Sequence, residues 1–376
     1  MRLFGLVPFK ILPAHSGGQA LTAGAYTQFA KLAKSFSAVS FITLRDSKHG
    51  SCDLFDLEEW KTPASLLIGL ERVGCSKMAY FQALDLYAQA LARMILRQGS
   101  QVVEVTMPWL MGVRRHLPAH VKVVLLMQNV EAMWYEETLD ATILPGLFKK
   151  WVSRLERRGL ECADHVVVLT GADRENIMSR YGVSGKKISV IPPGCDEFNM
   201  SATAEPARSG VRKKAVFVGS RFSGNRVASR ILIEQIAPAC KDFADVVLAG
   251  AICDDWANAA LPCNVKLAGF RPDLRAFFRG CDLFLNPNTM KTGINIKMMD
   301  ALSCGLPVLS TREGARGFEP LVGGAITTAE PRDFPELIRK SRPLSAAERE
   351  PLAGYFWPRI AQRRLDLYQT VLEGSS

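Results

Sequence analysis

One stretch decides the fold of this chain: Asn286-Pro-Asn-Thr-Met-Lys-Thr-Gly-Ile-Asn-Ile-Lys-Met-Met-Asp-Ala-Leu-Ser-Cys-Gly-Leu-Pro-Val308. It begins where one apolar run, Cys281–Asn286, ends, and it leads into a second run, Leu306–Thr311. Between them, apolar residues at helical spacing predict a helix over about Ile294–Ser303, and Gly305 stands just past its end. The pattern is that of two buried strands joined through a loop and a helix.

The predicted helix carries an unusual pair of charges. Ile296, Met299 and Leu302 share its core face, whereas Lys297 and Asp300 lie three apart on another face. A lysine in a first turn opposes the helix dipole, and a lysine before an aspartate is the poorer order for an ion pair. A bound diphosphate explains both, with Lys297 on phosphate oxygens and Asp300 accepting from a ribose diol. The alternative is a surface ion pair.

The same alternation extends outward over the rest of the chain. Near-continuous apolar runs are separated by segments of helical period such as Gly24–Ser35 and Lys77–Arg97. Strands that are apolar along both faces are buried on both sides, which predicts parallel, doubly wound α/β sheets. The predicted strands are Leu3–Val7, Ala38–Leu44, Gln101–Val105, Val121–Met127, His165–Thr170 and Lys187–Ile191, followed by Ala215–Gly219, Asp245–Gly250, Val265–Gly269, Cys281–Asn286, Leu306–Thr311 and Ala325–Thr328.

The alternation lapses once, which divides the chain into domains. A length of 376 residues suits two domains. We predict an N-terminal Rossmann-like domain over 1–198, a linker rich in Ser, Ala and Pro over 199–212, and a second such domain over 213–350. Two doubly wound units facing each other would form a cleft at their strand carboxyl ends. The last segment, Tyr355–Glu373, predicts an amphipathic helix that must dock on earlier structure.

Composition indicates a globular protein of a reducing compartment. Hydrophobic residues make up 48% and charged residues 22% of the chain, and no apolar run approaches the ~18 residues of a membrane span. The apolar start is broken by Pro8 and Lys10, so we interpret it as a first buried strand. The nine cysteines are scattered, without a CxxC motif or a cluster with histidine, which disfavours disulfides and zinc. We therefore expect a cytoplasmic protein.

A formal net charge of +10 favours an anionic partner. No basic run is interleaved with aromatic residues, so we expect no nucleic-acid partner. The segment Leu66–Gln98 alternates apolar and basic residues, which suggests peripheral contact with an anionic membrane at its inner face. The alternatives are an ordinary core-packed helix pair and a merely basic surface.

Two loops are candidate phosphate contacts. In His15-Ser-Gly-Gly-Gln19, which follows the first strand, Gly17 and Gly18 would let the backbone approach a sugar or diphosphate closely. Arg221 follows Gly219 and Ser220 at a strand end, where its guanidinium can bind a diphosphate through two donors. The alternatives are an ordinary turn and a solvated arginine.

Three stretches, in this order and spacing, resemble retaining glycosyltransferases of the GT-B fold, of the nucleotide-sugar-dependent family 4 type. The run Leu160–Thr170 with Ile191-Pro-Pro-Gly194 is similar to the end of that family's acceptor domain. The run Phe217–Arg221 with Asn225 is similar to its first donor-domain strand and loop. The stretch from Asn286 to Val308 is similar to its donor-site loop, helix and strand. The resemblance covers nearly the whole chain.

The resemblance implies a function. The first domain would bind an acceptor, the second a nucleotide-sugar donor, and residues 351–376 would return to the first domain. A sugar would pass from a nucleotide-diphosphate sugar to a glycan, lipid-linked or small-molecule acceptor, with retention of configuration. The family needs no metal and no other cofactor, because the departing diphosphate helps to deprotonate the attacking hydroxyl.

The resemblance also implies site residues. The catalytic candidates are Lys297, Arg221 and Gln128. The donor-binding candidates are Gly17, Gly18, Gly219, Ser220, Phe270, Thr292, Gly293, Ile294, Asn295 and Asp300.

The chain departs from the family pattern at several of these positions. Thr292 and Asp300 replace two glutamates, Gln128 replaces a histidine and cannot exchange a proton, and Asn225 stands near a missing basic residue for which Arg221 or Arg226 would compensate. These departures leave open a non-catalytic subunit that binds nucleotide-sugar. A nucleotide-sugar epimerase on the same frame is a further alternative.

Overall fold

The computed structural model describes residues 1–374 except residue 15 and the segments 43–52, 63–73, 139–144 and 197–211, with the backbone alone for 74–79 and 145. The chain divides into two compact units. Unit 1 comprises Met1–Pro193 and Trp357–Ser376, and unit 2 comprises Gly194–Phe356. The predicted linker over 199–212 lies outside the described residues except for Arg212.

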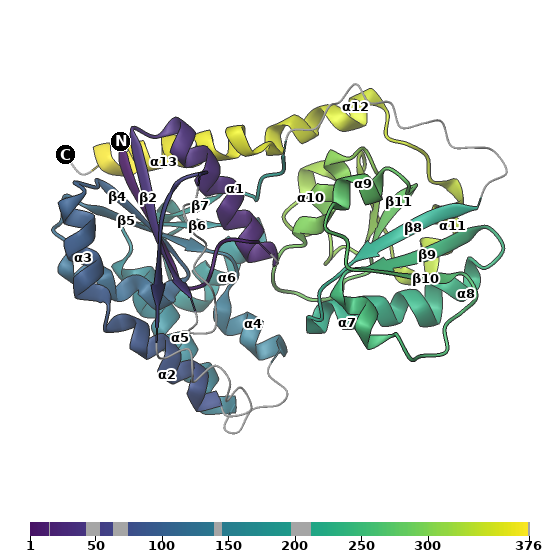
Figure 1. Cartoon of the computed structure of the whole chain (residues 1–376), viewed down its shortest axis with the longest axis horizontal. Helices are drawn as coiled ribbons and strands as arrows, with labels where there is room; N and C mark the ends of the chain where they lie inside the picture. The colour runs from purple at the N-terminus through teal and green to yellow at the C-terminus, as the bar shows by residue number, and fades with distance from the viewer. Residues whose placement is uncertain (15, 43–52, 63–73, 139–144, 197–211, 375–376) are drawn as a thin grey trace. The chain divides into compact units, whose positions relative to one another are not determined.

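Unit 1 is built on a seven-stranded sheet in the order β3-β2-β1-β4-β5-β6-β7, with every neighbouring pair parallel (Figure 1). Its strands are β1 (Arg2–Val7), β2 (Ser35–Ile42), β3 (Asp56–Lys61), β4 (Val102–Thr106), β5 (Lys122–Met127), β6 (His165–Val168) and β7 (Ile188–Val190). Its helices are α1 (Gly17–Leu32), α2 (Gly74–Asp85), α3 (Ala88–Arg97), α4 (Glu131–Thr138), α5 (Pro145–Cys162), α6 (Gly171–Tyr181) and α13 (Trp357–Glu373), with the 3₁₀ segments η2 (Pro108–His116) and η3 (Gly185–Lys187).

Unit 2 repeats this plan with a six-stranded parallel sheet in the order β10-β9-β8-β11-β12-β13. Its strands are β8 (Lys213–Val218), β9 (Ala244–Ala249), β10 (Val265–Gly269), β11 (Leu283–Asn286), β12 (Val308–Ser310) and β13 (Ile326–Thr328). Its helices are α7 (Ser223–Ile231), α8 (Ala237–Ala239), α9 (Leu274–Phe278), α10 (Ile296–Ser303), α11 (Phe334–Lys340) and α12 (Ala346–Arg349), with the π-helical segment η4 (Leu232–Ile236) and the 3₁₀ segment η5 (Ala251–Asp255).

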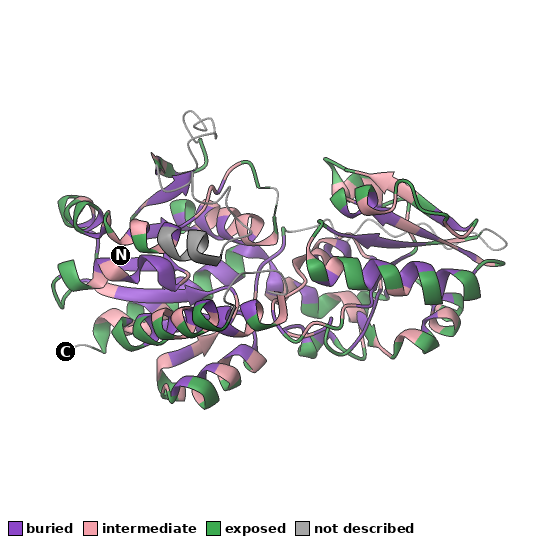
Figure 2. Cartoon of the chain, turned by 90° about the horizontal axis from the view of Figure 1, so that it is seen from below, coloured by how far each residue is buried: buried purple, intermediate pink, exposed green. Residues whose placement is uncertain are grey.

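Burial explains why both sheets are parallel. The central strands are buried along nearly their whole length, whereas the helices that cover them alternate buried and exposed faces (Figure 2). A strand buried on both faces needs helices on both sides, and helical crossovers join parallel strands. The predicted doubly wound α/β fold is therefore confirmed, with each unit enclosing its own apolar core.

Three elements differ from the sequence-based expectation. Strand β3 was not expected, because its sequence DLEEWK contains no apolar run. It pairs only with β2, and an edge strand of this kind tolerates charged residues. Helix α1 starts at Gly17 rather than Gly24, since Ser16 and Gln19 form a capping box there. The segment of helical period over Lys77–Arg97 begins earlier, at Gly74, and forms the two helices α2 and α3.

The C-terminal helix α13 belongs to unit 1 and packs on α1. Gly24 makes this packing possible, since a Cβ atom there would lie 2.3 Å from the Trp357 ring. A buried ion pair also fixes the helix: Arg364 donates to the Glu104 carboxylate on β4, and the Tyr368 hydroxyl donates to the same oxygen. The Arg364 guanidinium also lies 4.9 Å from the Phe29 ring centroid.

We expect Arg364→Ala to detach α13 from unit 1. The change leaves the Glu104 carboxylate buried without its partner, which costs about 3–5 kcal/mol of unfolding free energy. Arg363→Ala is the matched control, because Arg363 is the exposed neighbour on the same helix and its loss costs at most about 0.5 kcal/mol. Chemical unfolding followed by circular dichroism measures both variants. Equal stability of the two would contradict a structural role for the pair.

Candidate functional site

The sequence candidates fall in both units. In unit 2, the strand order reverses between β8 and β11, so the loops after these two neighbouring strands diverge to opposite sides of the sheet. Residues 219–222 follow β8, and residues 287–295 follow β11 and lead into α10. A reversal of this kind opens a crevice at the carboxyl ends of the strands, where α/β sheets bind their ligands.

Glycines line the carboxyl edge of three neighbouring strands in unit 2. The Gly219 amide donates to the Ala249 carbonyl oxygen (3.0 Å), and the Gly250 amide donates to the Gly269 carbonyl oxygen (2.8 Å). Gly250 has φ +91°, and a Cβ atom there would lie 2.4 Å from the Gly219 carbonyl oxygen. The backbone after β8 can therefore lie against the backbone after β9 only because Gly250 carries no side chain.

Two arginines at this edge share one carboxylate. Arg221 Nε lies 2.7 Å from Asp255 Oδ1, and Arg226 Nε lies 2.7 Å from Asp255 Oδ2. Arg226 and then Arg221, as hydrogen-bond donors, hold the pKa of Asp255 below its usual value. Both arginines are exposed, and Asn225 next to them donates to the Ser220 carbonyl oxygen (3.1 Å). Sequence reasoning found Arg221 and Arg226 but missed Asp255, which no motif marks.

The loop after β11 is fixed by side chains that sequence reasoning did not single out. The fully buried Asn286 accepts a hydrogen bond from Asn295 Nδ2 (2.6 Å) and donates to Ser310 Oγ (3.1 Å) and to the Gly314 carbonyl oxygen (3.0 Å). Further along, Arg316 donates to the carbonyl oxygen of Gly293. These bonds hold both ends of the segment that carries the donor-site candidates.

Helix α10 begins at Ile296 with Asn295 at its N-cap, two residues later than expected, and Gly305 follows its end with φ +79°. The Asn295 side chain makes no capping bond to the helix, because it binds Asn286 instead. Met298 and Met299 are fully buried, whereas Ile296 is only half-buried. Among the described residues, the first-turn amides of α10 thus have no side-chain cap.

Lys297 and Asp300 form the ion pair that the sequence left as the alternative. Lys297 Nζ lies 3.0 Å from Asp300 Oδ2, and the two side chains are 34% and 36% exposed. Such a half-exposed pair contributes about 0.5 kcal/mol or less to stability, so it does not explain why the helix carries it. Both side chains remain within reach of a ligand.

The other unit 2 candidates differ in exposure. Phe270 is 71% exposed at the end of β10, whereas Thr292 is only 7% exposed. Gly293 has φ +77°, a conformation that favours glycine, and Ile294 packs against the buried core. Phe270 thus presents a free aromatic face, and Thr292 is held inside the loop.

In unit 1, the structure brings Gln128 to the first turn of α1. Gln128 is 6% exposed, and its Nε2 lies 3.3 Å from the Gly18 carbonyl oxygen and 3.2 Å from Thr22 Oγ1. A Cβ atom on Gly18 would lie 2.5 Å from Gln128 Oε1. Gly17 and Gly18 are therefore the first residues of a helix rather than a loop, and Gln128 positions them.

Two buried glutamates next to Gln128 were also missed. Glu156 on α5 accepts from the amides of Glu131 (2.6 Å) and Ala132 (3.3 Å) at the start of α4, and from the Tyr181 hydroxyl. Burial, followed by repulsion from Glu156, raises the pKa of Glu131 to about 8. Burial raises the pKa of Glu156 to about 7. This pair contacts the start of α4, and no hydrogen bond among the described residues joins it to a candidate residue.

The described part of the chain contains no helix that is long and apolar enough to cross a membrane. Within the same residues, no group of three or more His, Cys, Asp or Glu side chains is placed to hold a metal ion. His165 at the start of β6 has a structural partner, since its Nε2 lies 2.9 Å from Ser189 Oγ, and burial lowers its pKa.

We expect Gly250→Ala to weaken ligand binding at the carboxyl edge of unit 2. Left-handed backbone strain costs about 1–3 kcal/mol for alanine, and the new methyl group would also push the Gly219 carbonyl away. Gly323→Ala is the matched control, because Gly323 has φ +87° but nothing within 4 Å of the added Cβ. Nucleoside-diphosphate titration by calorimetry compares them. A loss of affinity in the control as large as in Gly250→Ala would contradict the placement of this edge.

Two family models match the chain, one to each unit. A glycosyltransferase family 4 model matches residues 56–197, and a model of glycosyl transferases group 1 matches residues 212–344. A curated relative, D-inositol 3-phosphate glycosyltransferase of Geodermatophilus obscurus, is 25% identical over 245 residues, which cover 56% of this chain. The match spans 53% of that relative's length.

Solved structures share the complete fold. Sucrose-phosphate synthase from Thermosynechococcus elongatus superposes with a TM-score of 0.72 at 15% identity, covering 100% of both chains. HepE of Anabaena in complex with UDP superposes with a TM-score of 0.66 at 14% identity, covering 98% of this chain and 100% of the other. The chain therefore belongs to the glycosyltransferases of the GT-B fold, with a family 4 domain followed by a group 1 domain.

Proposed function

We propose that this protein transfers a sugar from a nucleotide-diphosphate sugar to an acceptor, with retention of configuration, and that unit 2 binds the donor. One observation carries the proposal: α10 begins at the β8–β11 reversal with uncapped amides and the Lys297–Asp300 pair on its accessible side. Amides at a helix N-terminus and a lysine beside them suit a diphosphate. The bound UDP in the HepE structure, which has the same fold, supports this class of donor.

The diphosphate would meet three kinds of donor. The first-turn amides of α10 and Lys297 would bind it from one side, and Ser220 and Arg221 at the end of β8 from the other. Arg221 already shares Asp255 with Arg226, so the three charges sum to one positive charge beside the site. Asp255 would then orient the guanidinium groups, and Arg226 would supply the basic side chain that Asn225 does not.

The rest of the donor would follow the same edge. Asp300 would accept hydrogen bonds from the ribose diol, and the exposed ring of Phe270 would lie beside the base. The segment Thr292–Asn295 would line the sugar and diphosphate with backbone groups. Hydrogen bonds from Asn295 to Asn286 and from Arg316 to the Gly293 carbonyl oxygen hold this segment in place. They support a donor site that is formed before the ligand binds.

The chemistry we propose needs charge stabilisation more than an acid–base pair. The bond from the anomeric carbon to the diphosphate oxygen breaks, a bond to the acceptor oxygen forms on the same face, and the acceptor proton passes to the departing diphosphate. Lys297 and Arg221 would stabilise the growing negative charge of that leaving group, and no metal would be required. Gln128 would contribute by positioning Gly18 and the start of α1, since an amide exchanges no proton.

A non-catalytic subunit that binds nucleotide-sugar is the second candidate, and Thr292 favours it. Thr292 stands where relatives place a carboxylate, and its buried side chain supplies no negative charge to the sugar. The purified chain distinguishes the two. Slow hydrolysis of the donor without acceptor supports a transferase, whereas tight donor binding without any turnover supports the subunit.

The acceptor class stays open between a glycan, a lipid-linked glycan and a small molecule. The scattered cysteines support a cytoplasmic protein. The net charge of +10 supports peripheral contact with an anionic membrane, which would favour a lipid-linked acceptor. Residues 66–73 of the segment behind that prediction lie outside the described residues. Co-flotation with anionic but not with neutral liposomes is the expected result, and failure to float with either would refute membrane contact.

We predict that Asp300→Ala and Lys297→Ala fail differently. Asp300→Ala should weaken donor and free nucleoside diphosphate equally, by about 10- to 150-fold, because a hydrogen bond to a charged group is worth about 1.5–3 kcal/mol. Lys297→Ala should also lower kcat, because part of its contact forms only as the leaving group gains charge. Calorimetry measures the affinities, and steady-state kinetics measures kcat. The parent enzyme should turn over equally fast with and without EDTA, because no metal is proposed.

The matched controls are Glu336→Ala and Lys340→Ala. These residues form a comparable ion pair on α11 of the same unit, with Nζ 2.7 Å from the carboxylate. Both controls should bind the diphosphate as the parent does, since both side chains are exposed and α11 ends beside Lys213, at the amino end of β8. The assignment of α10 to the donor site is wrong if Asp300→Ala binds the diphosphate as tightly as the controls.

A further inference from the structure

Unit 1 contains a hollow that none of the candidate residues lines. It has a volume of about 370 Å³ and lies between α2, η2 and α5. Two glycines in its lining let these elements pack closely around it. A Cβ atom on Gly159 of α5 would lie 3.0 Å from Pro108 Cβ, and a Cβ atom on Gly112 of η2 would lie 1.6 Å from Asp85 Oδ1. A side chain at either position would therefore displace a wall of the hollow.

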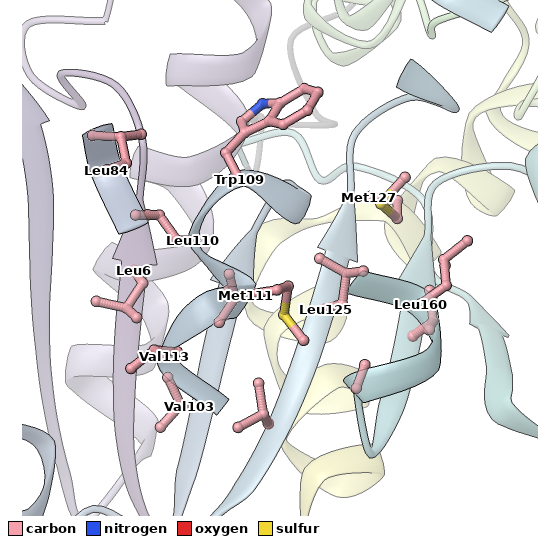
Figure 3. Packing of buried hydrophobic residues seen from close by; sticks show 14 of the residues in the cluster. Leu6, Leu84, Val103, Trp109, Leu110, Met111, Val113, Leu125, Met127 and Leu160 are labelled. Atoms are coloured by element: carbon pink, nitrogen blue, oxygen red, sulfur yellow. The ribbon is translucent and has the colours of Figure 1, made fainter. Parts of the chain in front are cut away.

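The walls of the hollow are three nearly parallel aromatic rings. The Phe81 ring stacks on Trp109 with 4.1 Å between centroids and 12° between planes. The Trp151 ring lies 6.3 Å from both and within 13° of each plane. Trp109 points away from the strands, whereas its neighbour Met111 points toward Leu125 (Figure 3). Phe81 and Trp151 are half-buried, so their apolar surface is available to a ligand.

The rim of the hollow is basic. Arg115 pairs with Asp85, and Arg114 Nε lies 3.6 Å from Asp164 Oδ2. Arg158 is exposed on α5 and has no charged or hydrogen-bonding partner among the described residues. The lining therefore carries three arginines against one aspartate, with one guanidinium unpaired directly beside apolar walls.

We propose that this hollow binds a single amphiphile, an apolar chain that ends in one anionic group. The aromatic walls, with Met111 and Leu155, would bury the chain, at about 25 cal/mol for each Å² of apolar surface removed from water. Arg158 would bind the anionic group at the rim by charge-assisted hydrogen bonds. This site is independent of the proposed donor site, because its lining includes none of the donor-binding or catalytic candidates.

A second basic hollow on the same unit provides the contrast. It is lined by Lys149, Lys150, Arg154, Arg157 and Arg180, with one carboxylate, Glu136. Its charged lining suits an anion without a chain, whereas the stacked rings of the first hollow suit a chain as well as an anion. Arg154 and Arg158 lie one turn apart on α5 and line different hollows, so they form a matched pair for mutation.

The test is a titration of the full-length protein, without nucleotide, followed by tryptophan fluorescence. Decyl phosphate below its critical micelle concentration should produce a saturable change, since Trp109 and Trp151 line the hollow. Decyl maltoside lacks the anion and glycerol 3-phosphate lacks the chain, so both should bind at least about 10-fold more weakly. Equal binding of either control ligand would overturn the proposal. Flotation with anionic vesicles without decyl phosphate binding would also overturn it, because it would assign lipid contact to the outer surface.

Variants locate the binding. Arg158→Ala should weaken decyl phosphate binding about 10-fold, the equivalent of one charge-assisted hydrogen bond of about 1.4 kcal/mol, whereas Arg154→Ala should leave it unchanged. Leu155→Phe should block binding by filling the hollow from a half-buried position, and circular dichroism would confirm its fold. Equal effects of the two arginine variants, or full binding by a folded Leu155→Phe, would show that the hollow is not the site.

Discussion

Every described strand of the two sheets runs parallel to its neighbours, and this constraint determines where functional residues can gather. Parallel strands end at one edge, so residues far apart in sequence reach the same edge without any direct interaction. In unit 2, this edge collects Gly219, Gly250 and Gly269, and the loop that leads to α10. The reversal between β8 and β11 then separates two loops and leaves room for a ligand.

A ligand site needs rigid support as well as room, and Asn286 supplies much of it. Its buried amide connects the end of β11 to the N-cap of α10 and to the segment after β12. A buried amide that lost these partners would cost about 1–3 kcal/mol, so the loop has little freedom to rearrange. The same interaction keeps the Asn295 side chain from capping its own helix, which leaves the amides of Ile296 and Lys297 for another acceptor, whereas the Met298 amide donates to the Asn295 carbonyl oxygen. Stability and ligand binding are thus coupled through one side chain.

The sequence predicts the architecture well because burial leaves a periodic pattern. All strands except β3 correspond to an apolar run. Strand β3 was not predicted, because a charged edge strand has no such run. The pairing of Lys297 with Asp300 follows from helical spacing alone. Asp255, Arg316 and Glu156 could not be predicted, because each acts through a partner 23 to 34 residues away or on another element. The buried Arg364–Glu104 pair spans 260 residues, and only the tertiary structure reveals it.

We propose that a nucleotide diphosphate binds at the carboxyl edge of unit 2, on the first turn of α10. Hydrogen–deuterium exchange tests this placement, using the nucleoside diphosphate that most raises the thermal stability of the protein. At 100 times its Kd the ligand adds about 2.7 kcal/mol of stability. We expect slower exchange at residues 219–221 and 293–298, with no comparable change at α11. Protection confined to unit 1, or none at saturation, would contradict it.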